Sequence, residues 1–159
     1  MKKVIIIALV AIVAILAIVL IVTSGDNSQA PVLTAQGLYN KISENVTLPT
    51  DMISRNSEEL DMRYGIDTTK AQDFIFMANS TSYYVDTIAI FKVENSEDRK
   101  TIKEQLTTIK QQAMNSMNNY DAEQYKIASD GEVIISGNYV CLFMTNDISK
   151  VKSTFNDNI

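Results

Sequence analysis

The sequence has no histidine and no tryptophan, and only one cysteine, two prolines and five glycines among its 159 residues. The missing histidine removes the commonest general base, the commonest zinc ligand and the usual pH switch. The single cysteine, Cys141, excludes an intramolecular disulfide, so the fold must be held by its core alone. Because Cys141 lies far from the N-terminus, it also cannot accept the lipid of a lipoprotein signal.

A long apolar run stands near the N-terminus. From Val4 to Val22 there are nineteen consecutive residues without a polar side chain, a glycine or a proline, and fifteen of them are Val, Ile or Leu. Their summed insertion free energy is about −6 kcal/mol, and a helix of this length spans about 28 Å, close to the thickness of a bilayer core. The run predicts a transmembrane signal anchor. The alternative is a cleaved secretory signal, whose apolar core is usually shorter.

The basic residues around this run predict its orientation. Lys2 and Lys3 precede it, and Lys41 is the only basic residue among the twenty that follow it. Positive charge collects on the cytoplasmic side, so the N-terminus is expected inside and the C-terminal domain outside, in a single-pass protein of the cell membrane. The predicted segments are a cytoplasmic tail at 1–3, the anchor at 4–22, a flexible linker at 23–32 and an extracytoplasmic domain at 33–159.

The part of the chain beyond the apolar run is acidic. Without Lys2 and Lys3, twelve basic residues remain against nineteen acidic ones, which gives a formal charge of −7. Such a balance argues against nucleic acid and against docking on anionic lipid headgroups. We therefore expect no nucleic-acid partner, and no cofactor is predicted.

Periodicity and turn residues predict an α+β fold, in which the transmembrane helix precedes one domain. Its sheet is expected to be four-stranded and mainly antiparallel, made of two hairpins, with helices packed mostly on one face. The strand at 84–93 is apolar on both faces near its middle, which favours a central position covered on both sides. Helices are predicted from the caps Thr34, Ser57, Ser96 (or Asn95) and Asp147, and strands at 74–77, 84–93, 132–135 and 139–144, with a short extended piece at 125–128.

Several stretches together resemble a known bacterial family. They are Tyr64-Gly65-Ile66-Asp67, the strand from Asp86 to Val93, the long helix after Asn95-Ser96-Glu97-Asp98, and the hairpin from Gly137 to Asp147. The chain is similar over residues 33–155 to the exported family called domain of unknown function 4358 (DUF4358). The resemblance implies a cell-envelope protein of a Gram-positive bacterium, and it brings no activity and no catalytic residues. Many members look like lipoproteins, whereas this chain lacks the lipid-accepting cysteine.

Few residues are candidates for catalysis or for metal binding. Cys141 alternates with apolar neighbours in a predicted strand, which is typical of a small buried hydrophobe; the alternative is a reactive thiol, which would have no histidine to activate it. Glu58, Glu59 and Asp61 stand at the start of a predicted helix, where the positive end of the helix dipole favours negative side chains. The alternative is that they form a weak cation site or an acid–base pair. We predict no catalytic, cofactor-binding or metal-binding residue, and no enzyme activity.

Aromatic and methionine side chains supply both faces of the predicted sheet, whereas the helices would cover mostly one. A sheet face left open would be a patch for a partner, and we expect that surface around Tyr83 and Tyr84. The sequence thus predicts a non-catalytic binding module of the cell envelope, whose partner is an envelope protein or peptide. Two alternatives stay open: a cell-wall hydrolase that uses carboxylates, and an inert oligomerising spacer.

Overall fold

The computed structural model describes residues 33–159, which form one compact unit. The predicted tail, anchor and linker at 1–3, 4–22 and 23–32 lie outside the described residues. Within residues 33–159, no helix combines the length and the apolar character needed to cross a membrane. The elements in chain order are α2 (Ala35–Asn45), β1 (Met52–Ser54), α3 (Ser57–Tyr64), the 3-10 helix η1 (Thr68–Lys70), β2 (Asp73–Asn79), β3 (Thr87–Lys92), α4 (Ser96–Met117), α5 (Ala122–Asp130), β4 (Glu132–Ser136), β5 (Tyr139–Met144) and α6 (Ile148–Asn156).

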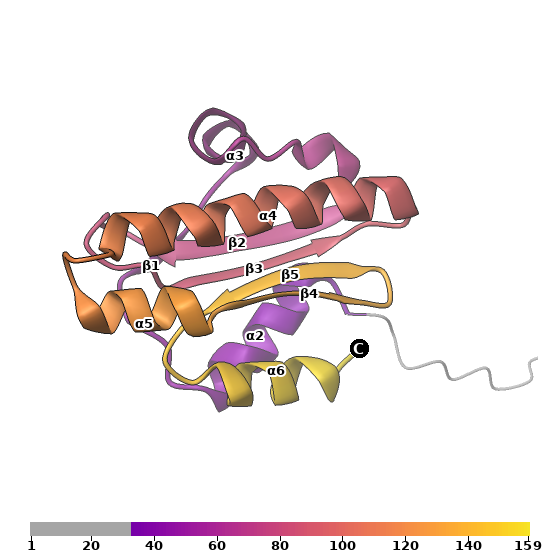
Figure 1. The fold of residues 1–159 in the computed structure, drawn as a ribbon. Helices are drawn as coiled ribbons and strands as arrows, with labels where there is room; N and C mark the ends of the chain where they lie inside the picture. Colours follow the sequence, from indigo (N-terminus) through magenta and orange to yellow (C-terminus); the bar gives the residue numbers. More distant parts are fainter. Residues whose placement is uncertain (1–32) are drawn as a thin grey trace, which may run out of the picture. The chain divides into compact units, whose positions relative to one another are not determined.

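These elements build an α+β fold around one antiparallel sheet (Figure 1). The strand order is β1-β2-β3-β5-β4, and every neighbouring pair is antiparallel. The sheet therefore has five strands where the sequence predicted four. The additional strand, β1, has three residues and pairs Met52 with Asn79 at the end of β2. So short a segment carries no alternation that a sequence pattern could display.

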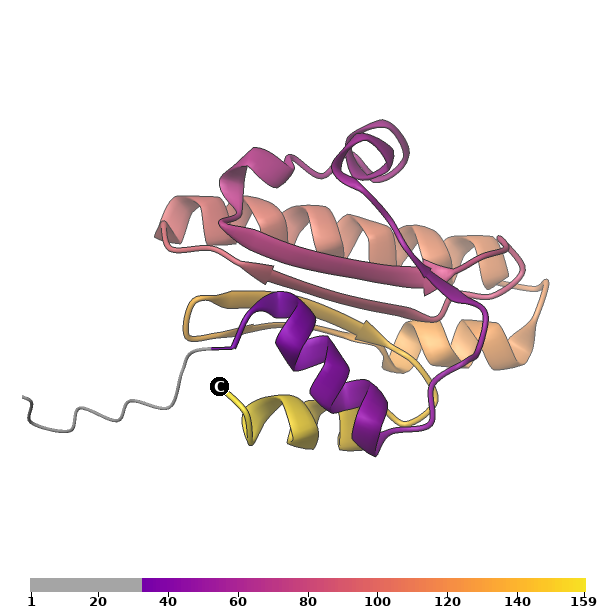
Figure 2. The ribbon, with the colours of Figure 1, turned by 180° about the vertical axis from the view of Figure 1, so that it is seen from behind.

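Helices cover both faces of the sheet, which corrects the prediction that they gather on one. Helices α3, α4 and α5 pack on one face through Leu60, Leu106 and Ile127, respectively. Helices α2 and α6 pack on the other face through Leu38 and Phe155, respectively. Figure 2 shows α2 and α6 side by side on this second face. Two cores result, one on each side of the sheet.

Coverage on both sides explains the composition of the central strands. Strand β3 is third in the order of five, and all its residues except Lys92 are buried. Ile88 and Ile90 belong to the core under α2 and α6, whereas Ala89 and Phe91 belong to the core under α4. The prediction of a central strand covered on both sides is confirmed, although the strand begins at Thr87 and not at residue 84.

Local capping residues begin most of the helices. The side chain of Thr34 accepts from the backbone N–H of Gly37, and that of Asn95 accepts from the N–H groups of Glu97 and Asp98. Helix α3 is capped by Asn56 and not by Ser57 as predicted. The piece predicted as extended at 125–128 is part of α5, which begins after Asp121.

Candidate functional site

The incoming chain is attached at one end of the sheet, and a cleft opens at the other. At one end, the first residue of β2, Asp73, lies across β3 from Tyr139, the first residue of β5. The Tyr139 hydroxyl donates to the carbonyl of Leu33 at 2.6 Å, and the N–H of Ala35 donates to the Asp73 carboxylate at 2.6 Å. The chain thus enters the domain at this end, which we call the entry end.

A cleft of about 590 Å³ opens at the opposite end of the sheet, where β2 finishes at Asn79 and β3 begins at Thr87. Its walls come from the β2–β3 loop, the end of α3, and the second half of α4, which lies on the left in Figure 1. Its volume falls within the range of sites for small ligands or short segments of a larger partner. We call it the distal cleft, and it is the candidate functional site.

The β2–β3 loop is held at both of its ends. The Asn79 side chain accepts from the backbone N–H of Thr81 at 3.0 Å and from its hydroxyl at 3.2 Å. At the other end, the N–H of Val85 donates to the buried Gln124 side chain at 2.9 Å. Because the loop is fixed at its base, residues 80–84 form an exposed wall of defined position.

Tyr83 and Tyr84, predicted to mark an open sheet face, lie in this loop instead. The premise of an uncovered face is wrong, because helices cover both sides of the sheet. Both side chains are nevertheless exposed, Tyr83 to 64% and Tyr84 to 50%. Tyr84 lines the distal cleft and Tyr83 stands next to it in the chain. Their role as a partner surface stays a prediction.

Two arginines that the sequence did not single out also line the distal cleft. Arg55 is 8% exposed; it donates to Glu59 at 3.3 Å and to the carbonyl of Asn79 at 3.0 Å, and its Nε has no partner. Arg63 is exposed in the last turn of α3. Helix α3 ends there because Gly65 adopts a left-handed conformation and Ile66 donates back to Leu60 at 3.0 Å.

One carboxylate, Asp86, lines the same cleft. It is only 4% exposed, and its Oδ1 has no hydrogen-bond partner. Burial raises the pKa of Asp86, the charges of Asp51 and Glu123 add to that effect, and a hydrogen bond with Thr145 opposes it. Such surroundings disfavour the ionised form of the Asp86 carboxyl. Its Oδ1 is able to accept one further hydrogen bond.

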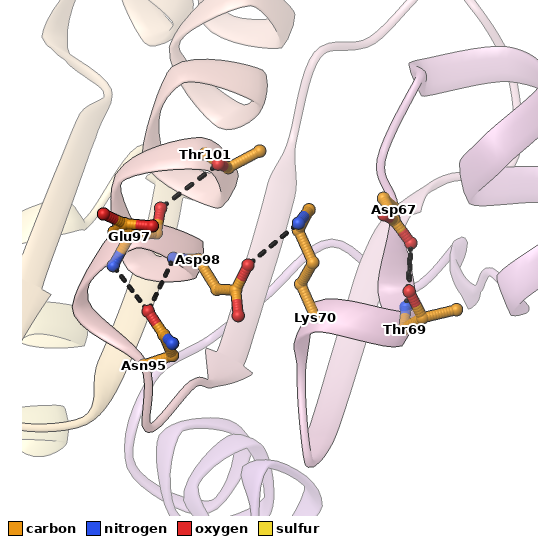
Figure 3. Close-up of polar contacts among 7 residues, drawn as sticks. All are labelled: Asp67, Thr69, Lys70, Asn95, Glu97, Asp98 and Thr101. Carbon is orange, nitrogen blue, oxygen red and sulfur yellow. Dashed lines mark hydrogen bonds and ion pairs between the residues drawn. The ribbon is translucent and has the colours of Figure 1, made fainter.

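Helix α3 forms one wall of the distal cleft, and polar contacts of the following helix η1 hold this segment in place (Figure 3). Lys70 donates to Asp98 in the first turn of α4 at 2.8 Å, and this ion pair joins two segments that are 28 residues apart. Asp67 caps η1 by accepting from the N–H and the hydroxyl of Thr69, and the hydroxyl bond is the largest of the effects that lower the pKa of Asp67. The α3–η1 segment is therefore attached to α4.

The other candidate residues lie outside the distal cleft. Cys141 is fully buried, and burial raises the pKa of its thiol, as expected for a small core residue. Glu59 forms a capping box with Asn56, whereas Glu58 and Asp61 line a separate hollow of about 310 Å³ together with Asp67. Within the described residues 33–159, no group of three or more acidic or cysteine side chains is arranged to hold a metal ion.

Comparison with known proteins gives one match. The family described as domain of unknown function (DUF4358) matches residues 44–145, a range that includes β1 to β5 and the whole distal cleft. No curated protein and no solved structure matches the chain. The resemblance inferred from the scaffold residues is confirmed by this match.

Proposed function

The chain belongs to the family described as domain of unknown function DUF4358, and from this premise we propose that it is a membrane-anchored, extracytoplasmic binding module without catalytic activity. Its place is the cell envelope of a Gram-positive bacterium, with residues 1–3 in the cytoplasm and residues 33–159 outside. Its partner is a protein or peptide of the envelope, held in the distal cleft. The apolar run of nineteen residues at 4–22 supports the anchor.

One observation carries the proposal: the distal cleft and the entry of the chain lie at opposite ends of the same sheet. The entry end is defined by the hydrogen bond of Leu33 with Tyr139, and the cleft by residues around Asn79 and Thr87. A domain attached to a surface through Leu33 can therefore keep its cleft accessible to a second molecule. This is the arrangement expected of a tethered receptor.

The composition of the cleft supports binding over catalysis. Asp86 is the only carboxylate among the residues that line it, and the chain has no histidine to act as a base. Exposed tyrosines such as Tyr84 offer large, rigid contact area at a low cost in conformational entropy. The second tyrosine, Tyr83, is well placed to extend this surface because it adjoins Tyr84 in the loop.

Site-specific photocrosslinking on intact cells tests the proposal. We expect a photoreactive phenylalanine analogue at position 83 to capture one defined envelope protein or peptide. The same analogue at Ile135 is the matched control, because Ile135 is 45% exposed but lies near the entry end, paired with Val140. Replacing Tyr84 with Ser should abolish capture while thermal unfolding stays unchanged. Equal capture from positions 83 and 135 would contradict the placement of the site.

A hydrolase that uses two carboxylates is a second candidate, and one observation favours it. Glu58, Asp61 and Asp67 all line the smaller hollow beside α3. A glycosidase needs one acid with a raised pKa and a second, ionised carboxylate on either side of the scissile bond. The pKa of Asp67 is lowered by its bond with Thr69, and the acid with a raised pKa, Asp86, lines the other cleft. Release of soluble glycan from purified wall material by the full chain would favour this candidate.

A further inference from the structure

The distribution of cationic side chains in the domain is uneven. Residues 23–159 carry a formal charge of −7, and the whole chain contains only three arginines. Two of them, Arg55 and Arg63, line the distal cleft, and no lysine lines it. In an acidic domain, this places two cations at the end of the sheet that is remote from Leu33; Arg55 is paired with Glu59, so Arg63 supplies the attraction for a negatively charged ligand. Arginine is the side chain best suited to a planar carboxylate, because its guanidinium can donate two parallel hydrogen bonds.

The unpartnered buried atoms of the domain concentrate at the same place. Within residues 33–159, three buried side-chain nitrogen or oxygen atoms lack a hydrogen-bond partner, and two of the three are Arg55 Nε and Asp86 Oδ1. Both residues are more than nine-tenths buried and both line the distal cleft. Buried polar groups are almost always paired, so one free donor and one free acceptor beside a single cleft point to a ligand that displaces the side chains covering them and supplies the complementary groups.

The chemistry of these groups selects the ligand. A peptide bond offers a carbonyl to a donor such as Arg55 and an N–H to an acceptor such as Asp86. A phosphate is mainly an acceptor, so it suits a donor such as Arg55 better than an acceptor such as Asp86. The apolar side chains of Ile109 and Met117 in the cleft wall are suited to an apolar side chain of the same segment.

We propose that the distal cleft binds an extended acidic segment of a partner protein, with a carboxylate of that segment on Arg63 and a peptide group of its backbone on Arg55 and Asp86. This inference rests on the proposed binding function and adds the class of ligand. Arg63 is exposed and supplies the first electrostatic attraction, whereas Arg55 lies deeper and is held in place by Glu59. Tyr84 then packs against the segment from the loop.

The test uses the full chain in detergent micelles and two fluorescein-labelled pools of short peptides. Both pools are randomised among apolar residues, but one carries two glutamates at fixed positions and the other two glutamines. We expect saturable binding measured by fluorescence anisotropy, with the glutamate pool about tenfold tighter, because hydrogen bonds to charged groups contribute more than neutral ones. This preference should decrease as salt is added.

Variants assign the effect to the cleft. Arg63→Gln should reduce the preference for the glutamate pool to near one, and Arg63→Lys should restore part of it. Lys100→Gln is the matched control: it removes the same charge from an exposed position in the first turns of α4, away from the cleft, and should keep the preference. Circular dichroism before and after each titration reports whether a variant is folded.

Other outcomes overturn the inference. Absence of binding by both pools, or equal binding of both that Arg63→Gln leaves unchanged, would show that the ligand is not an acidic segment. Competition by inorganic phosphate at concentrations that displace the glutamate pool completely would assign the site to a phosphate. If Tyr84→Ser abolishes photocrosslinking in cells while Arg63→Gln has no effect on either pool, the binding function stands and the acidic ligand alone is wrong.

Discussion

At the scale of single residues, Asp86 is a carboxyl whose ionisation opposes folding. Its carboxyl is buried at the base of the β2–β3 loop, where burial and the charges of Asp51 and Glu123 raise its pKa. A pKa that is higher in the folded chain means that the folded state holds the proton more tightly. Ionisation of Asp86 therefore lowers the free energy of unfolding, and this loss develops as the pH rises from the unfolded pKa, about 3.9, through the folded pKa.

We expect Asp86→Asn to stabilise the protein at neutral pH and to have little effect near pH 3, where the carboxyl is protonated in both states. The measurement is urea denaturation at a series of pH values, in which the difference between the variant and the native chain should grow with pH and then become constant. The exposed Asp157 supplies the control Asp157→Asn, which should change stability little. A native chain more stable than Asp86→Asn at pH 7 would show that the bond with Thr145 outweighs the burial of the charge.

The residue scale also shows what a sequence can and cannot reveal about a site. The burial of Cys141 was predictable because alternation with apolar neighbours is a local signal. The exposure of Tyr83 and Tyr84 was expected for the wrong reason, since they lie in a loop and not on an open sheet face. Arg55 and Arg63 gave no signal, because their position in the same cleft as Asp86 depends on where α3 lies relative to the end of the sheet.

At the scale of elements, the starts of the helices are the best encoded part of the fold. Thr34 and Asp147 were predicted as caps and Asn95 as one of two alternatives with Ser96, and each of these three side chains accepts a backbone N–H in the first turn of its helix. These interactions span three residues or fewer, so the sequence alone contains them. Helix α5 was misread because Tyr125 and Ile127 favour strands, whereas packing of Ile127 and Ala128 under the sheet makes the segment helical.

The cap of α4 has a measurable contribution to stability. Asn95→Ala removes the acceptor for the N–H groups of Glu97, at 2.8 Å, and Asp98, at 3.4 Å, and should cost about 1 kcal/mol in free energy of unfolding. The control is Asn115→Ala, the same change at an exposed position inside the helix, where alanine is the better helix former. Chemical denaturation measures both variants, and equal stabilities would mean that the Asn95 cap contributes nothing.

At the scale of the whole molecule, strand order and layer assignment could not be read from the sequence. The class of fold and its antiparallel pairing follow from grouped strands and turns, and both are confirmed. That α2 and α6 share one face of the sheet depends on contacts between segments more than a hundred residues apart. The hydroxyl of Tyr139 reaching Leu33 is one such contact, and no local pattern predicts it.

The topology proposed for the whole chain predicts how the domain is released. A protease site inserted in the linker at 23–32, combined with an epitope tag after Ile159, should give a tagged domain that enters the medium only when protease is added to intact cells. The membrane should retain a short fragment containing residues 4–22. A tagged domain in the medium without protease would show that residues 4–22 are a cleaved signal and not an anchor.

The hydrogen bonds that hold Leu33 and Ala35 have a mechanical consequence. They attach the incoming chain to β2 and β5, the two strands that flank β3, at the ends remote from the distal cleft. In the topology proposed above, tension between the anchor and a partner in that cleft would act on the domain from opposite ends of its sheet. Because the chain runs from Ala35 through α2 to the edge strand β1, these two hydrogen bonds would bear a pull on Leu33 before it reached that edge. The two bonds would thus act as a clamp that shields the pairing of β1 with β2 from a pull at Leu33.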